Sequence, residues 1–273
     1  MQKGTVNQSI TLITRADDCG SSHSANIGIA QTLERGFLKN ISLMAPCGYI
    51  EEAARMLADR TDVCFGIHAT LNAEWDQMKW GPVLPVSQVP SLVDEYGMFW
   101  PSPYELALVK PDLDEIMREF DAQLTRLRAL GFRISYLDTH MAPEYEIAGL
   151  EERLNHWAKR EGLLYWNRYC ASLKPAARIE DLIEDMAARL RAAPPGQYLY
   201  VGHPAVDSPE MRKTGNKDYP GAFVARRRVE EAKLFTDPRI LQICREREIT
   251  PIRYDEAVEL TDSLPPLHEW LHM

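Results

Sequence analysis

Short apolar runs alternate with segments of helical periodicity along this chain. The apolar runs predict strands near residues 10–14, 40–45, 63–68, 133–137, 163–167, 197–202 and 250–254. The segments between them predict helices near residues 24–35, 51–59, 113–130, 147–161, 176–192, 225–235 and 239–247. About seven βα units in succession indicate an α/β fold with a parallel sheet, outer helices and right-handed crossovers.

The kind of parallel sheet follows from length and from one missing motif. No glycine-rich dinucleotide fingerprint is visible, so a closed or distorted (β/α) barrel is favoured over an open doubly wound sheet. A length of 273 residues suits one such barrel, and no internal repeat or linker interrupts it. We therefore expect one domain over residues 1–273, with its site at the carboxyl ends of the strands.

Two long segments break the alternation of strands and helices. Residues 71–110 are rich in proline and aromatic residues, and residues 203–224 form a second irregular stretch. Long loops in compact domains often bind ligands or cover a site. Trp75 and Trp100 are therefore candidates for stacking on a sugar ring. The alternative is that most of these aromatic side chains form a small core of the loop itself.

Three of the predicted strands end in side chains that can bind a metal ion. The first runs into Asp17-Asp18, the third into His68 and the fourth into His140. One Asp and two imidazoles suit a divalent cation and leave coordination positions open, as a catalytic metal requires. Each residue alone has a plainer interpretation, since an Asp pair can cap a helix and a histidine can pack in a core. The agreement of three strand ends favours the metal site.

Several neighbouring residues are candidates for proton transfer or substrate contact. Adjacent carboxylates in a turn point in different directions, so one of the Asp pair can bind metal while the other stays free as a base. Asp138 could orient a ligand, and His23 is a candidate substrate contact. His203 follows another strand and is a candidate general acid; the alternative is a loop histidine that packs on Pro204.

Charge and cysteine content narrow the class of protein. The chain has 31 basic and 40 acidic residues, a formal net charge of −9, and no basic run, which argues against nucleic acid and anionic membranes as partners. No apolar stretch approaches the roughly 20 residues of a membrane span. The five cysteines lack CxxC spacing, which indicates reduced thiols. The polar first nine residues lack the apolar region of a secretory signal. A cytoplasmic location is therefore expected.

Five short motifs, in this order and spacing, resemble the YdjC-like carbohydrate deacetylases. They are ADDCG at 16–20, NIGI at 26–29, GIH at 66–68, LDTH at 137–140 and GHP at 202–204. The late run Arg228–Glu231 with Leu234 is similar to a helix motif of that family. The resemblance extends from about residue 10 to residue 257, nearly the whole chain.

The resemblance implies a distorted βα barrel related to the polysaccharide deacetylases, holding one divalent metal ion, magnesium or zinc. It implies hydrolytic removal of an acetyl group from a small N-acetylated sugar or oligosaccharide. Carried over residue by residue, it makes Asp18, His68 and His140 the metal ligands and Asp17 the base. His203 in the GHP motif becomes the acid.

The chain departs from the family pattern close to the expected site. The family block H-x-D-S-H-x-H has Tyr136 and Ala142 in place of its first and last histidines, and Cys19 replaces a phenylalanine. These departures motivate a first alternative, a metal-dependent hydrolase of another amide or ester on the same scaffold. A second alternative is a non-catalytic sugar-binding protein, although Asp17 beside a full ligand set argues against it. A homodimer is compatible with the chain, but nothing in the sequence indicates one.

Overall fold

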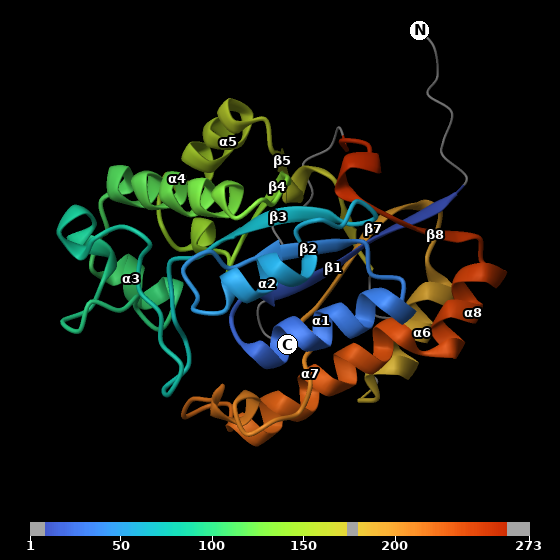
Figure 1. Cartoon of the computed structure of the whole chain (residues 1–273). Coiled ribbons are helices and arrows are strands. Elements are labelled where there is room, and N and C mark those ends of the chain that lie inside the picture. Colours follow the sequence, from blue (N-terminus) through green and yellow to red (C-terminus); the bar gives the residue numbers. More distant parts are fainter. Residues whose placement is uncertain (1–8, 174–179, 261–273) are drawn as a thin grey trace, which may run out of the picture.

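All strands of the structure belong to one parallel sheet. The computed structural model describes residues 9–173 and 180–260. The strands are β1 (Ile10–Cys19), β2 (Asn40–Leu43), β3 (Cys64–Ala69), β4 (Ile134–Thr139), β5 (Leu164–Tyr165), β6 (Ala171–Ser172), β7 (Gly196–Gly202) and β8 (Ile249–Ile252). Seven of them follow one another across the sheet in the order β5-β4-β3-β2-β1-β7-β6. The predicted α/β class is confirmed (Figure 1).

The sheet curls because β1 changes its neighbour halfway along. The first half of β1 pairs with β8, whereas its second half pairs with β2 on that side. Asn40 bridges the fork, since its side-chain amide donates to the carbonyl oxygens of Thr14, at 2.9 Å, and Ile252, at 3.0 Å. The result is a curled half-barrel, in agreement with the predicted distorted barrel of about seven parallel strands.

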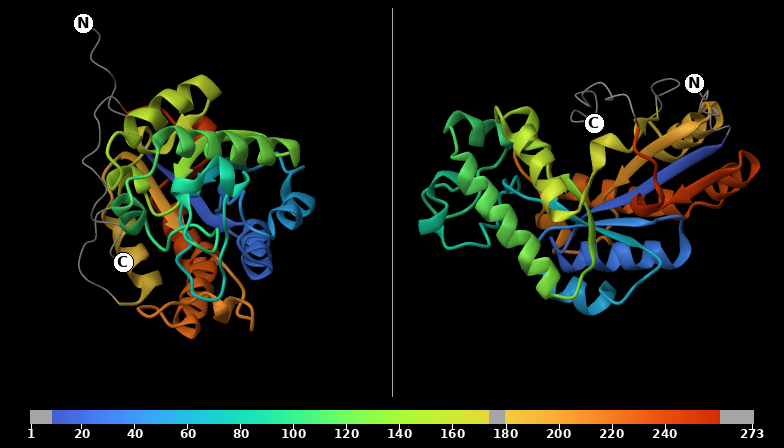
Figure 2. Two further views of the ribbon diagram at one scale, coloured as in Figure 1. Left: turned by 90° about the vertical axis from the view of Figure 1, so that its left-hand side faces the viewer. Right: turned by 90° about the horizontal axis from the view of Figure 1, so that it is seen from above.

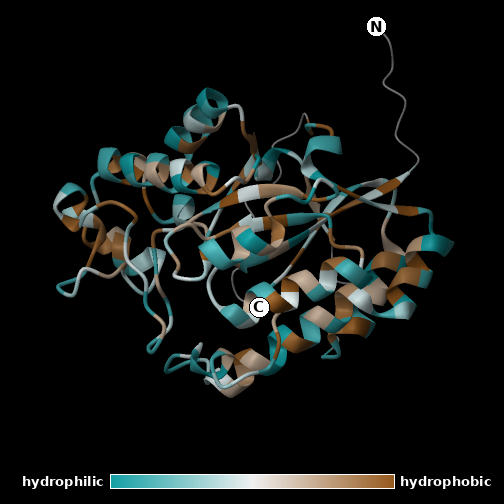
Figure 3. Cartoon of the chain, in the orientation of Figure 1, coloured by the Kyte–Doolittle hydropathy of each residue, from teal (hydrophilic) through white to brown (hydrophobic). Residues whose placement is uncertain are grey.

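The helices cover the outside of this sheet. They are α1 (His23–Arg35), α2 (Ile50–Leu57), α3 (Pro103–Leu108), α4 (Leu113–Ala129), α5 (Leu150–Glu161), α6 (Leu182–Ala192), α7 (Gly221–Thr236) and α8 (Pro238–Glu246). Helices α4 and α5 pack beside β3, β4 and β5. Helices α1, α7 and α8 pack beside β1, β7 and β8, and α6 packs on α7 and α8 (Figure 2). Figure 3 shows hydrophobic residues along the strands and mixed faces on the helices, the pattern expected of a sheet buried beneath amphipathic helices.

Polar caps define where several helices begin. The hydroxyl of Ser22 accepts the backbone N–H of Ala25 at the start of α1. The carboxylates of Asp112, Asp181 and Asp237 accept backbone N–H groups at the starts of α4, α6 and α8. Such caps satisfy the free N–H groups of the first helical turn. They fix where these helices begin.

The predicted elements are all present, with additions and with differences at some boundaries. The two-residue strand β6 and the short helix α3 are additional. The helix expected from residue 176 begins at Leu182, and residues 176–179 lie outside the described part of the chain. The first strand continues to Cys19, so Asp17 and Asp18 belong to the irregular end of β1, not to a turn after it. The single domain over residues 1–273 stays a prediction.

No helix within residues 9–173 and 180–260 combines the length and the apolar character needed to cross a lipid bilayer.

Candidate active site

Three side chains meet at the carboxyl ends of β1, β3 and β4. Oδ1 of Asp18 lies 3.6 Å from Nε2 of His68 and 3.5 Å from Nδ1 of His140. The two imidazole nitrogens are 3.2 Å apart. All three residues are buried, and each offers one atom to a common point, so they form a group able to hold a metal ion. The structure thus brings together the predicted ligand set.

The end of β1 is bent so that Asp18 faces this point. The β1–β2 register shifts between Ala16 and Cys19, and Asp18 has a φ of 63°, in the left-handed region. Bulges of this kind redirect side chains beside functional sites. Oδ2 of Asp18 contacts the guanidinium of Arg228 at 2.8 Å. The buried Oδ1 has no hydrogen-bond partner among the described residues.

Carboxylates fix which nitrogen of each histidine faces Asp18. Nδ1 of His68 lies 2.9 Å from Oδ2 of Asp138, its neighbour across the β3–β4 ladder. Nε2 of His140 lies 2.9 Å from Oε2 of Glu74. A carboxylate oxygen accepts hydrogen bonds, so in the neutral form of each ring the nitrogen that faces the carboxylate is the one that carries the proton. The opposite nitrogens, Nε2 of His68 and Nδ1 of His140, then direct lone pairs toward Oδ1 of Asp18.

The charges around Asp18, His68 and His140 favour a positive charge between these three side chains. Burial raises the pKa of Asp18, but the nearby charge of Arg228 is the main opposing effect and that pKa lies well below its usual range. Burial lowers the pKa of His68, and the charges of Asp138 and Asp17 more than reverse that effect. Burial likewise lowers the pKa of His140, and Glu74 more than reverses it. A buried carboxylate oxygen beside two lone pairs needs a proton or a cation.

Asp17 is not the free carboxylate expected from a turn. Its two oxygens accept from Nε and Nη2 of Arg15 at 2.7 and 2.8 Å. Arg15 precedes it by two residues on the same strand, where alternate side chains share a face. Burial raises the pKa of Asp17, but the charge of Arg15 outweighs it and the pKa is lowered. Asp17 is therefore ionised and held in one orientation.

His203 follows β7 and is paired with a glutamate of α7. Its Nδ1 lies 3.4 Å from Oε2 of Glu231, and its backbone N–H donates to the same oxygen. The ring is 39% exposed. Burial lowers its pKa, while the hydrogen bond and charge of Glu231 raise it above the ordinary value. Arg228 and Glu231 are three residues apart on α7, about one helical turn. One face of α7 therefore supplies the partners of both Asp18 and His203.

The other predicted residues take varied positions. His23 is half-exposed at the start of α1, with Nδ1 2.8 Å from Glu52. Asp138 is buried and contacts His68 and Arg15, at 2.9 and 3.0 Å. Trp75 and Trp100 are partly buried against the hydrophobic core. The substrate contacts expected of His23, Asp138, Trp75 and Trp100 stay predictions.

Sequence reasoning missed Arg15 and Glu74, and it did not link Trp80 to His140. The Trp80 ring packs edge-on against His140 at 6.1 Å between centroids. Glu74 comes from the long segment 71–110, six residues after His68, and no local pattern links it to His140. The signal for Arg15 was available, because a charged residue inside an apolar strand needs a buried partner.

Tyr136, which departs from the family pattern, packs in the core. The ring of Tyr136 lies over Gly66, where a Cβ atom would fall 2.2 Å from Cε2 of the ring. It also packs on Tyr254 at 4.2 Å between centroids, and its hydroxyl is 2.9 Å from Oγ of Ser42. Met141 and Ala142 both have positive φ, at 56° and 50°. Tyr136 thus replaces a polar family residue with a core residue beside the cluster.

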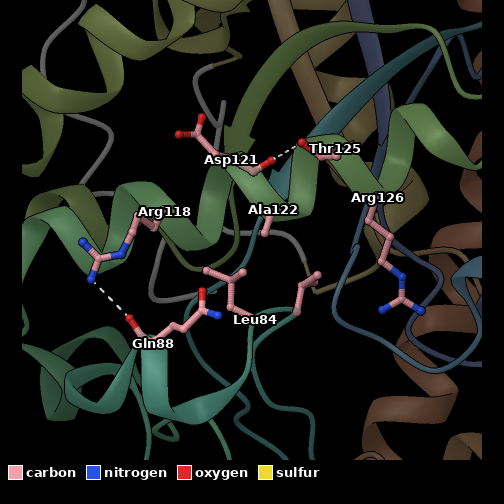
Figure 4. A pocket seen from close by; sticks show the side chains of 8 residues that line it. Leu84, Gln88, Arg118, Asp121, Ala122, Thr125 and Arg126 are labelled. Atoms are coloured by element: carbon pink, nitrogen blue, oxygen red, sulfur yellow. Dashed lines mark hydrogen bonds between the residues drawn. The ribbon is translucent and has the colours of Figure 1, made fainter.

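A separate pocket is lined by residues of α4 and of the long segment 71–110. Figure 4 shows it between that helix and residues 83–88, with Nη2 of Arg118 donating to the carbonyl oxygen of Gln88 at 3.1 Å. None of the predicted site residues lines it. The pocket therefore belongs to the packing of the long segment on α4, away from the histidine cluster.

The fold and the cluster together define an α/β half-barrel with an Asp-His-His group at its strand ends. Residues 11–144 match the model of a family described as YdjC-like protein. The resemblance that the motifs indicate is therefore confirmed, since residues 11–144 are YdjC-like.

Relatives named carbohydrate deacetylase support the same family. That of Thermoanaerobacter pseudethanolicus is 26% identical over 264 residues, covering 89% of this chain and 97% of the relative. That of Enterococcus faecalis is 36% identical over 132 residues, 47% of each chain. A crystal structure of an Enterococcus faecalis protein, described as a candidate for cellobiose-phosphate cleavage, has a TM-score of 0.74 and 23% identity. It covers 92% of this chain and 100% of that chain, and it shows the shared fold.

Proposed function

We propose that this protein is a metal-dependent hydrolase that removes the acetyl group from an N-acetylated sugar. The observation that carries the proposal is the buried Oδ1 of Asp18, which lacks a hydrogen-bond partner among the described residues and faces two imidazole nitrogens. The relatives named carbohydrate deacetylase support the class of substrate.

The donor set suits a divalent cation. The ligands would be Oδ1 of Asp18, Nε2 of His68 and Nδ1 of His140, and such a mixed oxygen and nitrogen set accepts zinc, magnesium, manganese or iron. Arg228 holds the other oxygen of Asp18, and Asp138 and Glu74 hold the far nitrogens of the histidines. A bound divalent ion would polarise the acetamide carbonyl and lower the pKa of water.

The remaining steps belong to side chains of this chain. Asp17, ionised and fixed by Arg15, accepts a proton from the attacking water as the water oxygen bonds to the acetamide carbon. His203, whose pKa is raised by Glu231, gives a proton to the nitrogen as the carbon–nitrogen bond breaks. The products are acetate and an amino sugar. The cationic amine of that product suits a chain of net charge −9.

An assay of acetate release tests the proposal. Purified protein should release acetate from N-acetylglucosamine oligomers, lose that activity after chelation and regain it on addition of zinc, magnesium or manganese. Equal activity before and after complete metal removal would contradict metal dependence.

The departures at Tyr136 and Ala142 favour one alternative, hydrolysis of another amide or ester on the same scaffold. Acetate release from simple acetate esters, with none from N-acetylated sugars, would support it. Sugar binding without any acetate release would instead indicate a non-catalytic protein.

A further inference from the structure

Two exposed aromatic side chains lie together where residues 203–224 run into α7. The rings of Tyr219 and Phe223, which we call the aromatic pair, are stacked with centroids 6.4 Å apart and an angle of 27° between their planes. The residues are 51% and 42% exposed. The guanidinium of Arg226 lies over the Phe223 ring at 5.4 Å. Single exposed aromatics are common, but two stacked rings with a cation over one of them form a small ordered surface.

The segment that carries the aromatic pair is firmly built. A small hydrophobic cluster of its own, made of Ala25, Ala205, Met211 and Ala225, ties it to α1 and α7. Close backbone contacts reinforce it, because a Cβ atom on Gly221 would lie 2.0 Å from the carbonyl oxygen of Arg212. The fold therefore holds these exposed rings in place, and rigid supports of this kind are typical of binding surfaces.

Hydrogen bonds connect this segment to the candidate active site. Asn216 and Tyr219 are joined in a tight turn, with Asn216 N–H donating to the Tyr219 carbonyl at 3.0 Å and Tyr219 N–H to the Asn216 side chain at 2.9 Å. The side-chain amide of Asn216 donates to the carbonyl oxygen of Glu74 at 3.2 Å, and the Glu74 carboxylate contacts His140. The N–H of Asp76 also donates to Gly215. Figure 1 shows these two segments side by side, in cyan and orange.

We propose that the aromatic pair is a carbohydrate subsite that stacks on a sugar ring next to the acetylated one. This inference rests on the proposed function and specifies it further, because it predicts a preference for substrates of two or more rings. Aromatic faces pack on the C–H faces of pyranose rings, and Arg226 offers N–H donors to their hydroxyl groups. The attachment of this turn to Glu74, the partner of His140, is what favours a part of the substrate over an unrelated partner.

Calorimetric titration with two probes tests the subsite directly. The probes are N-acetylglucosamine and its β-1,4-linked disaccharide, added to the wild-type protein and to Tyr219→Ala and Phe223→Ala. We expect each substitution to weaken disaccharide binding about tenfold and to leave monosaccharide binding unchanged, the scale of one lost ring contact. Tyr104→Ala, at another exposed tyrosine on α3, is the matched control and should change neither. Tyr219→Phe should retain the wild-type affinity.

Acetate release, measured on the same samples, separates this inference from the proposed function. Disaccharide binding that depends on the aromatic pair, without acetate release from either sugar, would keep the subsite and overturn the deacetylase. Acetate release with disaccharide affinity equal in wild type and both variants would overturn the subsite alone. A similar loss for both sugars, or binding of neither sugar by the wild-type protein, would also overturn the subsite.

Discussion

The guanidinium of Arg228 holds one oxygen of Asp18 at 2.8 Å and leaves the other oxygen facing His68 and His140. Both partners of this ion pair are largely buried, with side-chain exposures of 11% and 5%. Breaking a buried pair by removing one partner leaves an uncompensated charge. The pair therefore fixes the orientation of Asp18 and keeps its carboxylate ionised.

Replacing Arg228 should destabilise the protein, because Asp18 would then be a buried charge without its partner. We expect Arg228→Met, which keeps much of the aliphatic volume, to lower the free energy of unfolding of metal-free protein by about 3–5 kcal/mol. Urea denaturation in a chelating buffer measures the loss, and Arg226→Met, at an exposed arginine two residues earlier, is the matched control. Equal stability of the two variants would show that Arg228 does not compensate Asp18.

Glu74 and Asp138, which contact the two histidines, should increase the affinity for a metal ion. Glu74→Ala and Asp138→Ala each remove the acceptor that orients one imidazole, so zinc affinity should fall about 10–100-fold in each. Competition with a chromogenic chelator measures it. Glu95→Ala, at an exposed glutamate of the same long segment, should bind zinc as the wild-type protein does. Unchanged affinity in Glu74→Ala would show that Glu74 does not position His140.

Gly66 and Tyr136 should be energetically coupled. A methyl group on Gly66 would collide with the Tyr136 ring, so Gly66→Ala should destabilise the protein by about 1–3 kcal/mol. In a Tyr136→Ala background the ring is gone, and the same substitution should cost much less. A double-mutant cycle by urea unfolding gives the coupling. Additive effects would mean that the contact with the Tyr136 ring is not what requires glycine.

Glu144 should make stability depend on pH. Its carboxylate accepts from Oγ1 of Thr139 at 2.7 Å, and burial raises its pKa to about 7. The folded protein then binds the Glu144 proton more tightly than the unfolded chain does, and this tighter binding stabilises the folded state. The stabilisation is fully present below the pKa of the unfolded chain and is lost as the pH rises through about 7.

Glu144→Gln tests that dependence. The variant should be more stable than wild type at pH 8, by about 3 kcal/mol at most, and the difference should shrink toward pH 5. Urea unfolding at several pH values measures it. A constant difference across that range would contradict the ionisation of a buried Glu144.

The sequence could predict the elements and the meeting of Asp18, His68 and His140 because both depend on local pattern and on topology. Apolar runs and helical periodicity locate strands and helices, and parallel strands bring their carboxyl ends together, so Asp18, His68 and His140 could be placed at one edge. The two-residue strand β6 is too short to show a period. The bend at the end of β1 coincides with a shift in its register with β2 between Ala16 and Cys19, a tertiary feature.

The partners of Asp18 and the two histidines were harder to predict. Glu74 reaches His140 from a long irregular segment, and Arg228 reaches Asp18 from a helix more than 200 residues away in the chain. No spacing rule links such residues. Asp17 was expected to be free, but Arg15 on the same strand binds both of its oxygens. Arg15 stands out as a charged residue in an apolar strand, but the sequence alone does not show which carboxylate it contacts.

Anomalous diffraction from a crystal grown with zinc tests the central claim most directly, with Asp18→Asn as the control. We predict one strong zinc peak within about 2–2.3 Å of Oδ1 of Asp18, Nε2 of His68 and Nδ1 of His140, and its loss in the variant. A wild-type crystal with no zinc between these three atoms, or with the peak unchanged in Asp18→Asn, would contradict the account.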